Sequence, residues 1–105
     1  MKESNQEKKP AQPTKSADAN HSFVVGKSYL IRTVTLYYTG RLTSVTETDL
    51  LLDDAAWIAD TGRFHTALKT GSFNEVEPFV NSVVVPRGCI VDATAWPHAL
   101  PREQK

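Results

Sequence analysis

Hydrophobic and polar residues alternate along the middle of the chain, and alternation with a period of two is typical of β-strands. The stretch KSYLIRTVT is rich in β-branched and aromatic residues, which favour strands, and LYYTGRLTSVTET continues it. Gly40 inside this run indicates a bulge or a sharp bend. Three later apolar runs have the same character. The pattern therefore predicts five short strands, at residues 27–35, 36–48, 50–58, 80–85 and 89–94.

Residues 60–71 have a different character and predict a short helix between the third and fourth strands. Asp60 or Thr61 is suited to cap its start, and Gly71 stands where a C-terminal cap is expected. We expect about two turns of helix at most. Residues 72–79 form either an extended connection or a short strand.

The two ends of the chain differ in composition from the middle. The first 20 residues contain no Leu, Ile, Val, Phe, Tyr or Trp, and such a segment buries too little apolar surface to offset its chain entropy. We therefore expect a disordered polar tail at residues 1–22, a β-barrel domain at 23–96 and a C-terminal tail at 97–105 along its surface. Strands are not interleaved with helices, so the fold class is mainly β, as a small closed or nearly closed barrel.

Composition narrows the function classes. The 12 basic and 12 acidic residues balance, so net charge does not suggest a nucleic-acid binder, although a local patch is compatible with one. One cysteine excludes an internal disulfide framework. The N-terminus has no apolar signal-peptide core, and no apolar run approaches a membrane span, so we expect a cytoplasmic protein without membrane contact. A domain this small often gains buried area by oligomerising.

Two segments resemble the signatures of the Sm-like (Lsm) family. GRLTSVTETDLLLDDA, residues 40–55, has the glycine of a strongly bent strand, a polar turn and an apolar strand that ends in acidic residues. VVVPRGCIVDAT, residues 83–94, has two apolar strands around an Arg-Gly turn. The resemblance implies a five-stranded Sm-like or SH3-type barrel with the helix as an insertion. In that family the two strands beside the Arg-Gly turn pair between subunits and close a ring, so we expect a homo-oligomer.

The resemblance implies a ring-forming nucleic-acid-binding module, with single-stranded RNA as the first expected ligand. Arg87 and Gly88 match the family's turn, so Arg87 is expected near the pore. Tyr37, Tyr38 and Arg41 are further candidates, because aromatic rings stack on bases and arginines bind phosphate. Since Tyr37 and Tyr38 are neighbours in a strand, one should point inward and the other outward.

The sequence also departs from the family pattern. Thr46 stands where the family has an aspartate in the turn after the second strand, and Asp49 stands near the position of an asparagine. These departures and the neutral charge favour a rival function, a structural or protein-interaction barrel that binds an unknown protein partner and no nucleic acid. DDAAWIADTGRFHTAL, residues 53–68, also resembles a stretch of small uncharacterised bacterial and phage proteins, which suggests a phage-related role and no activity.

No set of residues suggests catalysis, a metal site or a cofactor. The three histidines are far apart in sequence and accompany one cysteine, Cys89, which we interpret as a small core residue. Asp53 and Asp54 are neighbours in a predicted strand, so their side chains should point to opposite faces and not share one substrate. We therefore expect a protein that is not an enzyme.

The two tryptophans have different expected places. Trp57 lies among small residues in AAWIA and is expected in the core. Trp96 precedes a proline and is expected to pin the C-terminal tail to the barrel.

Overall fold

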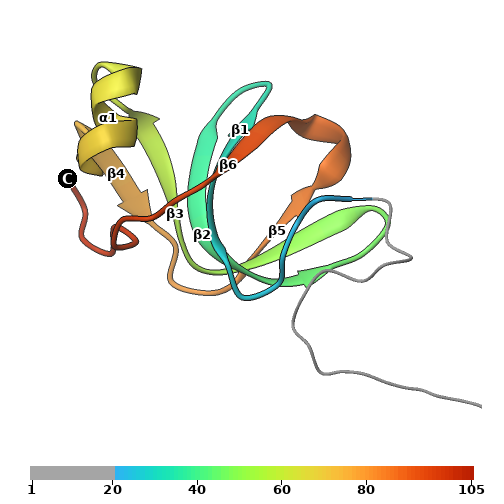
Figure 1. Ribbon diagram of the computed structural model, residues 1–105. Coiled ribbons are helices and arrows are strands. Elements are labelled where there is room, and N and C mark those ends of the chain that lie inside the picture. The colour runs from blue at the N-terminus through green and yellow to red at the C-terminus, as the bar shows by residue number, and fades with distance from the viewer. Residues whose placement is uncertain (1–20) are drawn as a thin grey trace, which may run out of the picture.

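The strands follow the alternating segments of the sequence in the computed structural model, which describes residues 21–105. The order of elements is β1 (Ser28–Thr33), β2 (Tyr37–Val45), β3 (Asp49–Asp60), α1 (Phe64–Thr70), β4 (Glu75–Pro78), β5 (Val83–Pro86), a 3₁₀ turn (Arg87–Cys89) and β6 (Ile90–Ala95), as Figure 1 shows. The mainly β fold with one short helix between β3 and β4 is confirmed. The predicted disordered tail at 1–22 lies outside the described residues, apart from its last two.

All strand pairs are antiparallel and form one sheet in the order β4-β3-β2-β1-β6, with β5 also paired to β3. β3 has 12 residues and is long enough to serve two partners: Asp49–Leu52 pair with β5, and Ala56–Asp60 pair with β4. The sheet therefore has six strands where the sequence predicted five, because the segments before and after Val80 both pair with β3. Within residues 21–105, β5 and β6 do not pair with each other, so the sheet is not closed.

A bulge in β3 bends the sheet between these two halves. Thr39 is opposite Ala56, but Arg41 is opposite Asp53, so β3 contains one residue more than β2 at this point. Asp54 takes up the difference with a φ of 50°. Gly40 of β2 faces the bulge, and a Cβ there would lie 3.0 Å from the Cβ of Leu52. The predicted bend at Gly40 thus rests on close packing of the two strands.

The bent sheet buries a hydrophobic cluster on each of its two faces. The cluster inside the bend consists of Tyr29, Ile31, Leu42, Leu50, Leu52, Ala55 and Val85. The cluster on the opposite face lies beneath α1 and the C-terminal segment and consists of Leu30, Ala56, Ile58, Ala67, Phe73, Val76 and Trp96. Alternate residues of β1 supply both clusters, as the period of a strand requires.

Helix α1 has 7 residues, about two turns as expected, but it begins later than the expected caps. It begins at Phe64 after Arg63 and has no side-chain cap, so the expected caps at Asp60 and Thr61 are wrong. Asp60 instead accepts a hydrogen bond of 2.8 Å from the backbone N–H of Gly62. The helix ends as predicted at Gly71, which has a φ of 77° and donates its N–H to Ala67 O at 2.7 Å.

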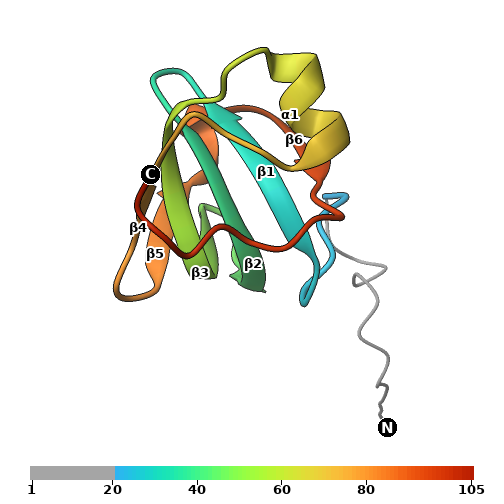
Figure 2. The same ribbon diagram turned by 90° about the vertical axis from the view of Figure 1, so that its left-hand side faces the viewer.

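Residues 97–105, called the strap below, return from β6 across the face that α1 partly covers and end beside β4, as the red segment in Figures 1 and 2 shows. Trp96 begins this return, is 3% exposed and stacks on Phe73 with 5.0 Å between ring centroids. The expectation for Trp57 is wrong, because this ring is 38% exposed. Trp57 follows the bulge in β3, and it lies outside the segment Asp49–Leu52 that pairs with β5.

Candidate functional site

The residues expected to bind nucleic acid do not converge on one place. Arg87 and Gly88 lie in the 3₁₀ turn between β5 and β6, beside the turn that joins β2 to β3. Tyr37 and Tyr38 lie at the opposite end of β2, where that strand begins. Arg41 lies midway along β2. The candidates therefore lie at the start of β2, at its middle, and at a turn beside its end.

Arg87 connects two turns. Its backbone N–H donates to Thr48 O at 2.8 Å, and its Nη1 donates to Thr46 O at 2.7 Å. These hydrogen bonds hold the β5–β6 turn against the β2–β3 turn, so some of the guanidinium's N–H donors are used within the fold. Next to it, Gly88 has open space where a Cβ would be, so neither packing nor a positive φ requires glycine there.

The two tyrosines lie on opposite faces of the sheet, but neither ring is free. Tyr37 packs against the cluster beneath α1 and meets Phe64 with 5.7 Å between ring centroids. Tyr38 packs against the cluster inside the bend and stacks on Phe79 at 6.1 Å and 16°. Both side chains are half-buried. The expected outward ring, available to stack on a base, is thus covered by another aromatic residue.

Arg41 is held by two carboxylates. Its Nη1 donates to Asp54 at 2.6 Å, and its Nη2 lies 3.8 Å from Asp53. The hydrogen bond from Arg41 lowers the pKa of Asp54 and raises that of Arg41 itself. The expectation that Asp53 and Asp54 point to opposite faces is wrong, because the positive φ at Asp54 breaks the strand alternation and both side chains lie near Arg41.

These charges line an open polar pocket of about 280 Å³ together with Arg102 and residues 80–82. Its groups bind one another: Asp53 accepts a hydrogen bond from Ser82, and Arg41 joins both aspartates. Two arginines and two aspartates also cancel in charge. The pocket therefore holds a satisfied ion-pair network.

Two histidines and the cysteine make hydrogen bonds within the fold. His21 accepts a hydrogen bond from Phe23 N, and His98 Nε2 bonds to Leu68 O at 2.8 Å. The thiol of Cys89 donates to Pro86 O at 3.1 Å. Among residues 21–105 there is no group of three or more histidines, cysteines and carboxylates that could hold a metal ion. The same residues contain no helix that is long and apolar enough to cross a membrane.

The edge of β6 lies at the end of the sheet and has no strand partner within residues 21–105. Trp96 N donates to Ser28 O at 2.9 Å, and antiparallel pairing alternates, so Thr94 and Asp92 direct their backbone groups to β1. Ala93 and Ala95 therefore direct their N–H and C=O groups away from the sheet. Both side chains are small and uncharged, and such an edge is a template for another strand.

β5 presents a shorter edge of the same kind. The N–H of Arg87 and the backbone groups of Val85 face β3 for hydrogen bonding. The backbone groups of Val84 and Pro86 therefore point away from β3. Proline offers no N–H, which leaves Val84 as the central residue of this edge. Val84 is 56% exposed, and Val91 beside the β6 edge is 53% exposed.

No family model, curated protein or solved structure matches this chain. Within residues 21–105, no strand pairs with the outer edge of β5 or of β6.

Proposed function

We propose that this chain is an assembly module that forms homo-oligomers by pairing β5 of one copy with β6 of the next. One observation supports the proposal most directly: β6 offers outward backbone groups at Ala93 and Ala95 with no charged side chain to repel an added strand. Asp92, the one acidic residue of β6, is neutralised by Arg32, whose Nη2 lies 2.5 Å away. The edge thus has the low charge that strand addition favours.

The exposed valines support the same contact. Val84 and Val91 belong to the two strands that would meet, and burying an exposed aliphatic side chain favours association by about 25 cal/mol for each Å² removed from water. β5 and β6 are different surfaces, so their contact is head-to-tail, and head-to-tail contacts close into rings when the rotation between copies allows it. The Sm-like resemblance proposes the same pair of strands. An Sm-like barrel completed by neighbouring copies is consistent with a sheet that does not close on itself.

The experiment is light scattering on a size-exclusion column with two matched variants. Val91→Lys places a charge beside the open edge and should weaken the oligomer about tenfold or more. Thr94→Lys places the same charge on the same strand, where the backbone faces β1, and should leave the mass unchanged. A wild-type mass of 11.6 kDa at all concentrations would refute the proposal.

Single-stranded RNA is a second candidate ligand, favoured by the position of Arg87 where the β2–β3 and β5–β6 turns meet. The Sm-like resemblance expects its ligand at these two turns. The hydrogen bond to Thr46 O and the enclosed tyrosines rank this candidate below assembly. Fluorescence anisotropy with labelled oligouridine should then show weaker binding for Arg87→Ala than for Arg63→Ala, an exposed arginine at the start of α1. Equal binding by both variants would remove Arg87 from the site.

A further inference from the structure

The edge of β4 is occupied by the strap. Val76 N donates to Lys105 O and Lys105 N donates to Val76 O, both at 3.0 Å. This reciprocal pair of bonds is the hydrogen-bonded pair of an antiparallel ladder. Lys105 therefore acts as a short added strand on an edge that would otherwise be open.

Arg102 anchors the same segment three residues earlier. Its Nη1 donates to Ala55 O at 2.7 Å, and its Nη2 donates to Phe79 O at 2.9 Å. The two carbonyls lie side by side in the sheet, because Phe79 N donates a hydrogen bond to Ala55 O. The planar guanidinium thus spans the point where the chain leaves β4.

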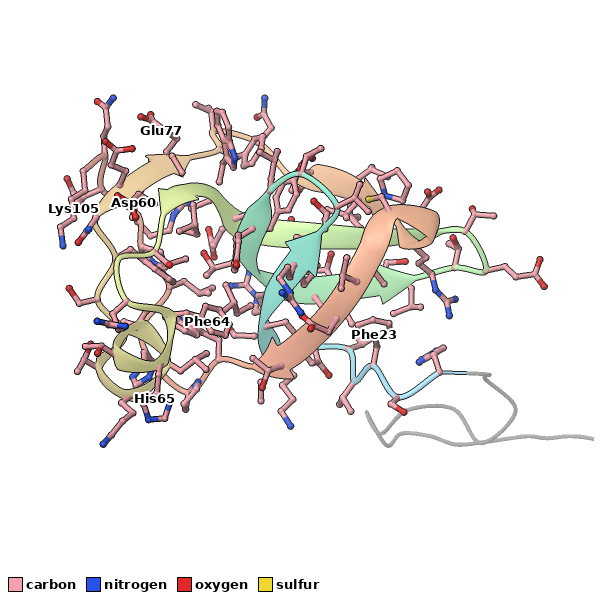
Figure 3. All side chains as sticks on the ribbon, turned by 90° about the horizontal axis from the view of Figure 1, so that it is seen from above. Phe23, Asp60, Phe64, His65, Glu77 and Lys105 are labelled. Atoms are coloured by element: carbon pink, nitrogen blue, oxygen red, sulfur yellow. The ribbon has the colours of Figure 1, made fainter. Side chains whose placement is uncertain are left out.

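Acidic side chains lie along the same edge. β4 carries Glu75 and Glu77, and the strap carries Arg102 and Lys105. Lys105 Nζ donates to Ser72 Oγ at 3.5 Å. Gln104 Nε2 donates to Glu77 Oε1 at 3.2 Å. Figure 3 shows Glu77 and Lys105 at the same end of the molecule as Asp60.

The two halves of the strap are held differently. His98 bonds to α1 and lies edge-on to Trp96 with 4.8 Å between ring centroids, and Leu100 packs on the buried cluster. Beyond Leu100 the contacts are the polar ones given above, and residues 102–105 are exposed. An open pocket of about 350 Å³ lies between residues 101–105 and the segment 71–73 with Val76. The outer half of the strap, residues 101–105, is therefore held by a few polar contacts and lines this open pocket.

We propose that the β4 edge is a binding groove for an extended basic peptide of a partner protein, and that residues 101–105 fill this groove as an internal ligand. The partner segment would carry an arginine three residues before the residue that pairs with Val76, as Arg102 stands before Lys105. β-strand addition supplies main-chain hydrogen bonds, and the arginine on the carbonyls of Ala55 and Phe79 and the side-chain contact to Glu77 supply selectivity. This groove lies on β4 and does not depend on the β5–β6 contact.

The test uses the full chain and a fluorescein-labelled peptide with the sequence of residues 99–105. In the variant Arg102→Ala/Gln104→Ala the internal ligand is weakened, so the peptide should bind about tenfold or more tightly than it binds the wild type. Glu103 makes no side-chain hydrogen bond in the described structure, so Glu103→Ala should bind as the wild type does. A peptide with alanine in place of its arginine should lose about tenfold in affinity for the double variant.

Nuclear magnetic resonance locates the bound peptide, because the amide signals of Val76 and Phe79 should shift on binding. Equal affinity of the wild type and the double variant, or no binding by either, would overturn the proposal. If the double variant does not fold, Gln104→Ala alone should still give a gain of about threefold, and its absence would have the same meaning. The Val91→Lys chain should bind the peptide as its parent does, which separates failure of this groove from failure of the β5–β6 contact.

Discussion

The sheet ends in two different ways. At β4 the strap supplies the missing strand, with a reciprocal backbone pair at Val76 and a guanidinium on two carbonyls. At β6 no described segment of the chain covers the outward groups of Ala93 and Ala95. One edge is thus paired within the chain, and the other has no strand partner among residues 21–105.

The difference concerns where the sheet is open to an added strand. Open strand edges invite pairing, and proteins protect them with charges, prolines, short strands or covering segments. β4 is covered and acidic, and β5 is short and ends in Pro86, whereas β6 has six residues and no such protection beyond Asp92. The proposed pairing between copies uses the end of the sheet that lacks this protection. The variants below alter one end of the sheet and leave the other intact.

Removal of the strap's inner anchor should have the largest effect. Trp96 is buried between Phe73 and His98, so Trp96→Ala should lower the free energy of unfolding by about 3–5 kcal/mol. Val84→Ala changes an exposed residue at the open end and should cost no more than about 0.5 kcal/mol in the monomer. Urea denaturation measures both values. Similar losses for the two variants would mean that the covered and open ends contribute equally to stability.

A smaller loss is expected where the strap passes the end of α1. A Cβ on Gly71 would lie 2.6 Å from Cγ of His98, and the φ of 77° disfavours any side chain. Gly71→Ala should therefore cost about 1–3 kcal/mol. In the double variant, His98→Ala should recover the part of the stability loss that is due to the clash. His98→Ala alone should lose stability, because it removes the hydrogen bond to Leu68 O. Thermal unfolding of the four chains gives this coupling, and strictly additive losses would show that the imidazole does not press on Gly71.

The course of the strands could be predicted because it rests on local patterns. The alternation at KSYLIRTVT and at VVVPRGCIVDAT reports strands directly, and Gly71 ends the helix where a left-handed residue is needed. The strap could not be predicted in this way. Arg102 meets the carbonyl of Ala55, 47 positions earlier, and no periodicity records a contact of that range.

The candidate site was predicted in part, since residue types were identified and their surroundings were not. Arg41 was found as a basic residue on β2, but its two aspartate partners depend on the unusual φ of Asp54. The same bulge accounts for the wrong expectation at Trp57. The sequence favoured the Arg-Gly turn as a site, and the turn does form, but the bond from Arg87 to Thr46 O belongs to three-dimensional packing.

The smallest expected effect concerns the ion pair that joins the open strand to β1. The hydrogen bond from Arg32 lowers the pKa of Asp92 below its ordinary value of 3.8. The folded state therefore binds a proton at Asp92 less readily than the unfolded state, and the pair stabilises the fold at pH values above 3.8. As the pH falls through the lowered pKa, this contribution is lost.

Asp92→Asn should accordingly have a flatter dependence of stability on pH in the acid range than the wild type, and a difference from it that shrinks as the pH falls. Both partners are exposed, so the effect should be small and should weaken in high salt. Urea denaturation of the wild type, Asp92→Asn and the control Glu103→Gln at several acid pH values measures it. Identical pH profiles for the wild type and Asp92→Asn would show that the pair does not hold β6 to β1, and the open edge would then depend on its backbone bonds alone.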